Sequence, residues 1–285
     1  MVQMKMSSPH VEGELSTREI QLESLKILKA IDAVCRREGI RYWLAYGSLI
    51  GAVRHQGFIP WDDDLDIYMP RPDYERFLAC FDGHAAELAP YVAIKPEVGL
   101  RRPFLITRVS NPEFKMVGEY GDEVDELGTF VDIYPLDGLA NSGEEARRRE
   151  QAAHKLTLKY MQANNFDCYN RGNGVLKRFA KRVQSVLTGG PEKYQEQLNE
   201  LCREYAFDES KLCYALSWVA TSEIFIYERS WFDETVRMKF EDMEAPVPVG
   251  YDELLTCEYG DYLRIPPQAE RVGHHFYAIV RRASS

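Results

Sequence analysis

The stretch YWLAYGSLIGAVRHQGFIPWDDDLDIYM, residues 42–69, decides the fold expected for this chain. Its first part is apolar and aromatic up to a Gly-Ser pair, which predicts a strand over 40–46 and one or two helical turns over 48–55. Acidic and apolar residues then alternate over 64–69 and predict a second strand, because successive side chains of a strand point to opposite faces. The sequence therefore predicts a pocket shared by the Gly-Ser turn and the acidic strand.

The flanking sequence extends this unit in both directions. Ser16 and Glu19 have capping-box spacing, and apolar residues then recur at helical intervals until Gly39 ends the helix. Prolines end the acidic strand, and Asp73 is expected to cap a helix that reaches about Phe81. Further strands are expected over 91–94, 103–109 and 129–134.

The second half of the chain has a different character. The pattern from 142 to about 218 is mainly helical, and short strands, turns and a helix near 251–258 follow. A mixed sheet followed by a helical half predicts an α+β fold. We expect a core at 1–140, a mainly helical elaboration at 141–230 and a C-terminal part at 231–285.

The composition excludes several classes of protein. A formal charge of -10 and a pI near 5.2 argue against a nucleic-acid partner, because binding the phosphate backbone requires a basic surface. Six cysteines lie without any C-x-x-C pair, which predicts reduced thiols. The sequence has no signal-peptide pattern and no apolar run long enough to span a membrane, so we expect a cytoplasmic protein.

Two acidic residues form the strongest candidate for a metal site. Asp64 and Asp66 would lie on the same face of the expected strand, where adjacent carboxylates repel each other unless a cation lies between them. Mg²⁺ prefers such hard oxygen ligands. The alternative is a solvated acidic loop, which the interleaved Trp61, Leu65 and Ile67 make less attractive.

Gly47 and Ser48 form a candidate phosphate cradle. Glycine lets the backbone approach a ligand closely, and the amide groups at the start of a helix favour an anion. The alternative is a plain structural turn.

Asp132 is the third acidic candidate, since it lies in the middle of a strand between apolar residues. It could face the pair at 64 and 66, or it could be held by a buried salt bridge. Asp137, which precedes Gly138, is expected to be a turn residue.

These motifs together resemble the LicD family of phosphotransferases. The resemblance rests on GSLIGAVRHQGFIPWDDDLDI at 47–67, on FVDIYPLDG at 130–138, and on FEDMEAPVPVGYDELLTCEYGDY at 240–262 followed by two prolines and His274. The segment 140–230 carries no matching motif.

The resemblance implies a nucleotidyltransferase fold of the polymerase-β type, related to fukutin-type proteins. By the matching motifs, Gly47 and Ser48 would hold the donor phosphates, and Asp64, Asp66 and Asp132 would bind one or two Mg²⁺ ions, or Mn²⁺ in their place. The family transfers phosphocholine or other phosphorylated alcohols from CDP-linked donors, with release of CMP. Its acceptors are sugars of teichoic acids or lipopolysaccharide, often on lipid carriers at the cytoplasmic leaflet. The alternative is a nucleotidyltransferase that moves NMP from an NTP to a small acceptor.

Other residues complete the expectations. Arg54 is the preferred phosphate contact, with a salt bridge to a nearby acid as its alternative, and Arg108 is a weaker phosphate candidate. A cationic choline would need an aromatic cage. Its candidate members are Tyr42, Trp43, Tyr46, Trp61, Tyr68 and Tyr134. The basic amphipathic stretch 175–187 is either a core helix or a peripheral contact with the inner face of a membrane.

Overall fold

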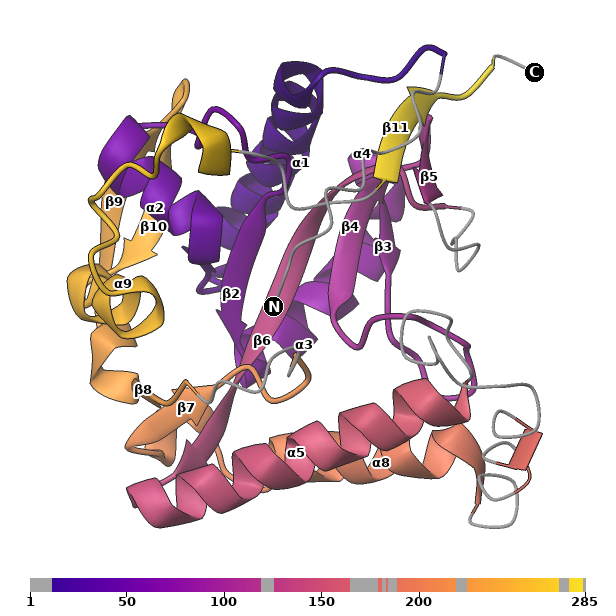
Figure 1. Cartoon of the computed structure of the whole chain (residues 1–285), viewed down its shortest axis with the longest axis vertical. Coiled ribbons are helices and arrows are strands. Elements are labelled where there is room, and N and C mark those ends of the chain that lie inside the picture. The colour runs from indigo at the N-terminus through magenta and orange to yellow at the C-terminus, as the bar shows by residue number, and fades with distance from the viewer. Residues whose placement is uncertain are drawn as a thin grey trace.

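The computed structural model describes residues 12–118, 126–164, 179–180, 183, 189–218, 225–271 and 277–283. Its centre is a mixed sheet, shown in Figure 1, and the expected α+β class is confirmed. The path through the sheet runs β1 (Trp43–Leu44), β2 (Asp66–Pro70), β6 (Thr129–Ala140), β4 (Thr107–Asn111) and β3 (Val92–Ile94). β2 and β6 pair in parallel, and the other neighbours along this path are antiparallel.

Smaller strand pairs border this sheet. β7 (Leu212–Tyr214) pairs with the C-terminal part of β6 and with β8 (Tyr227–Glu228). β9 (Thr235–Phe240) and β10 (Met243–Pro248) form a hairpin, and β5 (Phe114–Gly118) pairs with β11 (Tyr277–Arg281).

The first helix, α1 (Thr17–Glu38), has the ends that its sequence predicts. The Ser16 and Glu19 side chains form the capping box, and Gly39 ends the helix with a φ of 61°, a conformation that glycine adopts without steric cost. Apolar residues of its inner face, among them Ile27, Leu28 and Ile31, pack into the core.

The first two strands are shorter than predicted. β1 pairs with β2 at only two positions, Trp43 with Tyr68 and Leu44 with Ile67, so it does not extend over 40–46. β2 begins at Asp66, and residue 64 lies in the preceding loop. The intervening helix α2 (Tyr46–His55) begins earlier than expected, so that Gly47 and Ser48 lie in its first turn.

The capping role expected for Asp73 is wrong. Pro70 precedes the first turn of α3 (Arg71–Gly83), and Asp73 lies inside that turn. Its buried carboxylate instead accepts hydrogen bonds from Arg41 at 2.7 Å and from Arg76 at 3.3 Å. The short helix α4 (Ala85–Leu88) follows.

The helical half is shorter than its pattern suggests. α5 (Gly143–Ala163) and α8 (Gly190–Arg203) lie side by side below the sheet in Figure 1. Beyond α8 the expected helix is replaced by a single 3-10 turn (Phe207–Glu209) and by β7, which returns the chain to β6. One apolar core contains residues of the sheet, of α5 and α8, and of the C-terminal part.

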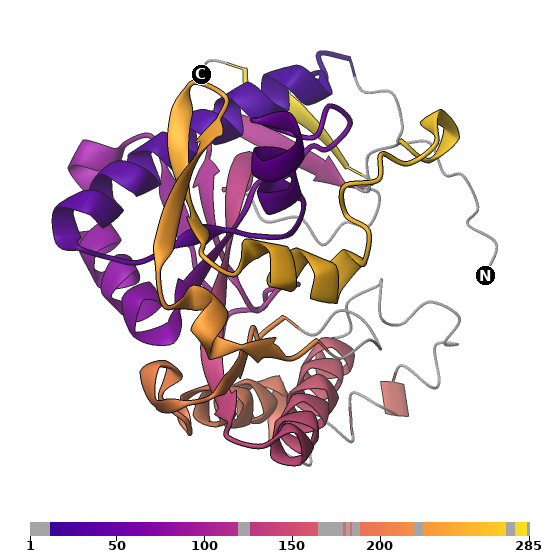
Figure 2. The same ribbon diagram turned by 90° about the vertical axis from the view of Figure 1, so that its left-hand side faces the viewer.

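The C-terminal part contributes α9 (Tyr251–Tyr259), as predicted, between 3-10 turns at Arg229–Phe232 and Gln268–Glu270. α9 packs against α2, and both lie on the same side of the sheet in Figures 1 and 2. The five cysteines within the described ranges are free thiols, in line with the expectation of reduced cysteines. None of the helices that the structure describes combines the length and the apolar character needed to cross a membrane.

Candidate active site

The parallel pairing of β2 and β6 brings two of the predicted acidic residues together. Asp66 lies opposite Asp132 in the register, and Tyr68 lies opposite Tyr134. Because side chains alternate along a strand, these four residues share one face of the sheet. The backbone of the two strands is also paired here, because the Asp132 amide donates a hydrogen bond to the carbonyl of Leu65 at 2.9 Å, and both residues are buried. The β2–β6 register therefore forms the centre of the site.

Asp66 is a buried acid in an acidic environment. Burial raises the pKa of its carboxyl group well above the ordinary value, and the charges of Asp64 and Asp132 raise it further. Its Oδ1 atom has no hydrogen-bond partner among the residues that the structure describes. Such an oxygen is expensive to bury, which fits a position that a cation occupies during function.

Asp132 is paired with Arg108 of β4, so the salt-bridge alternative is what the structure shows. Nε of Arg108 donates to Oδ1 at 2.7 Å and Nη2 donates to Oδ2 at 3.2 Å. The guanidinium lies between the rings of Phe104 and Phe130, 4.2 and 4.5 Å from their centroids. Burial alone would lower the pKa of Arg108, but Asp132 outweighs it and the pKa is raised.

Asp64 belongs to the half-buried loop before β2 and does not share a strand face with Asp66. Its charge nevertheless reaches Asp66, as the raised pKa of that group shows. Within the described ranges no three His, Cys, Asp or Glu side chains converge as a metal site. The predicted three-carboxylate centre is therefore not assembled in this arrangement. The carboxylate oxygens of Asp64 and Asp66, and above all the unpartnered Oδ1 of Asp66, still fit a divalent cation.

Gly47 and Ser48 support the acidic loop and strand from α2. The buried Ser48 hydroxyl accepts a hydrogen bond from the Asp66 amide at 2.9 Å, so it holds the first residue of β2 in place. A Cβ atom at Gly47 would collide with the carboxylate of Asp62. The missing side chain thus leaves room for the carboxylate of Asp62 beside α2. The contact of Gly47 and Ser48 with a donor phosphate stays a prediction.

Arg54 lies at the end of α2 and donates to backbone carbonyls, at 2.7 Å to Tyr262 and at 3.2 Å to Arg264. These bonds, which go to carbonyls and not to an acid, hold the segment after α9 against α2. A phosphate contact by Arg54 stays a prediction. His274 and most of the stretch 175–187 lie outside the described residues.

The structure adds a tyrosine cluster that the sequence did not reveal as a unit. Oε1 of Glu258 accepts hydrogen bonds from Tyr68 at 3.0 Å and from Tyr227 at 2.5 Å, and burial raises the pKa of its carboxyl group to about 7. We define the tyrosine cluster as Tyr46, Tyr68, Tyr134, Tyr214 and Tyr227. Of the proposed cage residues, Tyr42 bonds Asp32 and Trp43 bonds Thr235, so they belong to other parts of the core.

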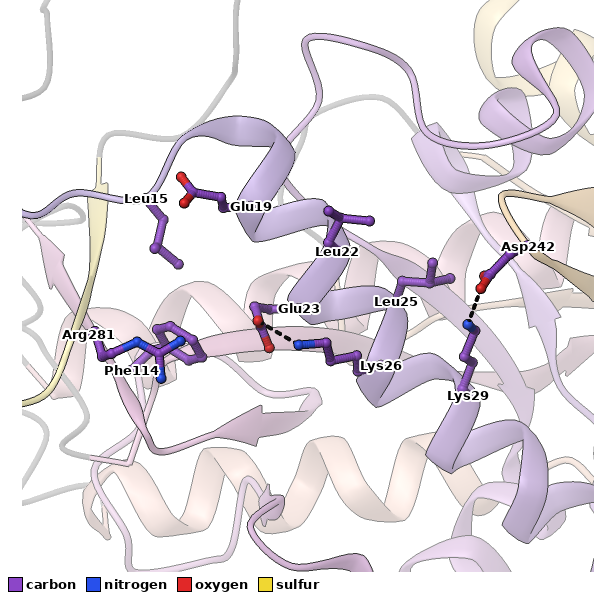
Figure 3. Close-up of a pocket in the computed structure, with 10 residues that line it drawn as sticks. All are labelled: Leu15, Glu19, Leu22, Glu23, Leu25, Lys26, Lys29, Phe114, Asp242 and Arg281. Atoms are coloured by element: carbon purple, nitrogen blue, oxygen red, sulfur yellow. Dashed lines mark hydrogen bonds and ion pairs between the residues drawn. The ribbon is translucent and has the colours of Figure 1, made fainter.

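A separate cavity of about 340 Å³ lies on the outer side of α1 (Figure 3). Leu15, Leu22, Leu25 and Phe114 form its apolar lining. Lys26 pairs with Glu23 at 2.8 Å and Lys29 with Asp242 at 2.6 Å on its rim. None of the acids of the β2–β6 site lines this cavity, so it is not part of the candidate active site.

Comparisons with known proteins show what this chain is similar to. Residues 39–137 match the family described as LicD/FKTN/FKRP, nucleotidyltransferase domain. The lipopolysaccharide cholinephosphotransferase LicD of Haemophilus influenzae is 28% identical over 273 residues, which cover 92% of this chain and 97% of that protein. The ribitol 5-phosphate transferase FKRP of Homo sapiens is 56% identical over 34 residues, 12% of this chain and 7% of that protein. Over residues 39–137 this chain is therefore similar to the LicD/FKTN/FKRP family, and its similarity to LicD extends along most of its length.

Proposed function

We propose that this protein is a phosphotransferase that moves a phosphorylated small alcohol, phosphocholine or a similar group, from a CDP-linked donor to a glycan hydroxyl and releases CMP. The proposal rests on one observation: carboxylates outnumber basic side chains where β2 pairs with β6. Asp66 is buried there, with Asp132 opposite and Asp64 nearby. The names of the two relatives, a cholinephosphotransferase and a ribitol 5-phosphate transferase, support this class of reaction.

Asp66 and Asp64 are the residues that would hold Mg²⁺ or Mn²⁺. The bound ion would supply neutralisation of the charge on the donor phosphates. Ser48 holds the Asp66 backbone, so Asp66 is positioned before the donor binds.

Two roles are open for Asp132. While Arg108 stays on it, Asp132 positions that guanidinium beside the site, where its charge can meet a phosphate oxygen. If Arg108 turns to the donor, the released carboxylate becomes a further ligand or accepts the proton of the attacking hydroxyl.

The test is a screen of CDP-choline, CDP-ethanolamine, CDP-glycerol and CDP-ribitol, with release of CMP as the readout. Each donor is incubated with and without an acceptor extract, and with EDTA as the control for metal dependence. We expect CMP release from at least one donor that needs both acceptor and metal. Release of pyrophosphate from an NTP, with no CMP from any CDP donor, would instead establish the alternative nucleotidyltransferase reaction.

The acceptor is proposed to be a glycan, free or lipid-linked, met at the inner face of a membrane through peripheral contact. Co-sedimentation with anionic vesicles checks this contact. Binding that falls with added salt supports it, and no binding at low salt contradicts it.

A further inference from the structure

The carboxylate of Glu258 is the least expected polar group near the site. It lies in the last turn of α9, and its Oε1 atom accepts hydrogen bonds from Tyr68 and Tyr227. Its other oxygen, Oε2, is buried and has no hydrogen-bond partner in the part of the chain that the structure describes. A buried carboxylate oxygen without a partner is costly, so its persistence needs an explanation.

Further aromatic rings pack against the two tyrosines that bond this carboxylate. The centroid of Tyr46 lies 5.1 Å from that of Tyr68 and 5.0 Å from that of Tyr134, and Tyr214 lies 5.3 Å from Tyr227. Trp218 stands edge-on to Tyr134 at 5.5 Å. Tyr46 of the cluster and the neighbouring Trp218 are half-buried residues, so the cluster extends from the core towards the molecular surface.

The charges around the cluster favour a cation. Among the described side chains no lysine, arginine or histidine forms an ion pair with Glu258 or lowers its pKa. Ring faces carry negative potential and attract cations, most strongly when water is excluded. A carboxylate beside several rings therefore suits a positively charged group, and an alkylated ammonium matches aromatic surroundings best.

The cluster also adjoins the acids. Tyr68 follows Asp66 by two residues on β2, and Tyr134 follows Asp132 by two residues on β6. Residues two apart on a strand lie on the same face at a separation of about 7 Å. A donor with its phosphate at the acids would thus place a group on a short carbon linker against these tyrosines.

Resting on the proposed function, we propose that Glu258 and the tyrosine cluster bind the ammonium group of the donor's alcohol. This site would make the protein select a cationic phosphorylated alcohol over a neutral polyol. Glu258 and the rings are specificity-determining in this proposal, and they act on the alcohol and not on the phosphorus.

The test measures binding without turnover. Choline chloride and its neutral isostere 3,3-dimethylbutan-1-ol are titrated calorimetrically into the full chain at about pH 8, where Glu258 is ionised. The variants are Glu258→Gln, which keeps the size of the side chain, and Trp218→Leu at the rim. Glu253→Gln, an exposed change on the same helix, is the matched control.

We expect choline to bind more tightly than the isostere to the unmodified chain. Glu258→Gln should weaken choline about tenfold and leave the isostere unchanged, Trp218→Leu should weaken choline several-fold, and Glu253→Gln should change neither. Equal binding of choline and isostere, or unchanged choline affinity in folded Glu258→Gln, would overturn the inference.

The donor screen separates this inference from the proposed function. Choline binding that depends on Glu258, with no CMP release from any CDP donor, leaves the cation site standing and removes the transferase. Efficient turnover of CDP-ribitol with no preference for CDP-choline, and no effect of Glu258→Gln on that ratio, removes the cation site and keeps the transferase.

Discussion

Strand β6 carries two buried aspartates, Asp132 and Asp137, and each pairs with an arginine from a neighbouring element. Asp137 accepts a hydrogen bond from Arg71 of α3 at 2.6 Å, and the two charges balance. Asp132 is paired with Arg108, but Asp66 and the charge of Asp64 lie close to the same pair, so the acids outnumber the arginine. A balanced pair of this kind holds the fold together, whereas an excess of buried acid marks a place for a cation from outside.

The largest effect is expected at the acidic centre. Asp66→Asn should lower the rate of CMP release by about a thousandfold, because it removes a proposed metal ligand and with it the neutralisation of phosphate charge. The melting temperature without metal should stay the same or rise, because one of the repelling carboxylates is gone. Steady-state kinetics at low Mg²⁺ and thermal denaturation measure the two quantities.

Asp64→Asn is the matched comparison and should give a similar loss of rate. Near-normal activity in either variant would take that residue out of the site. A large drop in melting temperature for Asp66→Asn would place Asp66 with the structural aspartates.

The opposite result is expected at Asp137. Asp137→Ala should lower the free energy of unfolding by about 3 kcal/mol, because Arg71 is then left buried without its partner charge. Activity per folded molecule should remain close to that of the unmodified chain. Denaturant unfolding measures the first quantity.

A double variant, Asp137→Leu with Arg71→Met, sharpens this test because it removes both charges at once. It should recover much of the lost stability. If the single and double variants were equally unstable, packing and not charge would explain the role of the pair.

A smaller effect is expected from the pH dependence of Glu258. Its folded-state pKa of about 7 lies above the ordinary 4.5, so the folded state binds this proton more tightly than the unfolded state does. The contribution to stability is complete below about pH 4.5 and is lost as pH rises to about 7. Relative to Glu258→Gln, the unmodified chain should lose about 3 kcal/mol over this window.

Unfolding curves of both proteins at a series of pH values measure that difference. Parallel pH profiles for the two would mean that Glu258 keeps an ordinary pKa in the folded protein.

The smallest effect is expected at Ser48. Ser48→Ala removes the acceptor of the Asp66 amide and should lower the free energy of unfolding by about 1 kcal/mol, with a several-fold loss of rate. Ser48→Thr retains the hydroxyl and serves as the control. A loss of rate as large as that of Asp66→Asn, without loss of stability, would assign the hydroxyl to the donor phosphate and not to the Asp66 backbone.

The sequence was sufficient where local chemistry decides the structure. The capping box of Ser16 and Glu19, the glycine end of α1 and the position of α9 follow from neighbouring residues, and all were predicted. Asp137 was misread as a turn residue because its partner Arg71 is distant in the sequence and only the folded sheet brings them together. Asp64 was placed on the strand because the alternation of acids and apolar residues does not show where pairing with β1 and β6 begins.

Glu258 shows the same limit at the candidate site. Its place in a motif was visible, but its surroundings come from α2, β2, β6, β7 and β8, which no spacing rule connects. Asp132 was expected either to face the other acids or to be held by a buried salt bridge, and in the structure it lies opposite Asp66 and is paired with Arg108.

The central segment leaves the sheet and returns to it at the same place. α5 begins soon after β6 ends. Tyr205 forms a β-bridge with Gly138, and a larger side chain at 138 would meet the carbonyls of residues 205 and 206. β7 then pairs with residues 137–140. An excursion with its two ends fastened side by side can change in length at little cost in chain entropy. Asp132 of the candidate site lies nearer the start of the strand, and α5 and α8 share their apolar core with the sheet. An exchange of this segment between relatives must therefore keep the residues that pack there. Chimaeras between relatives are best joined within 140–142 and after 214, with the glycine at 138 retained.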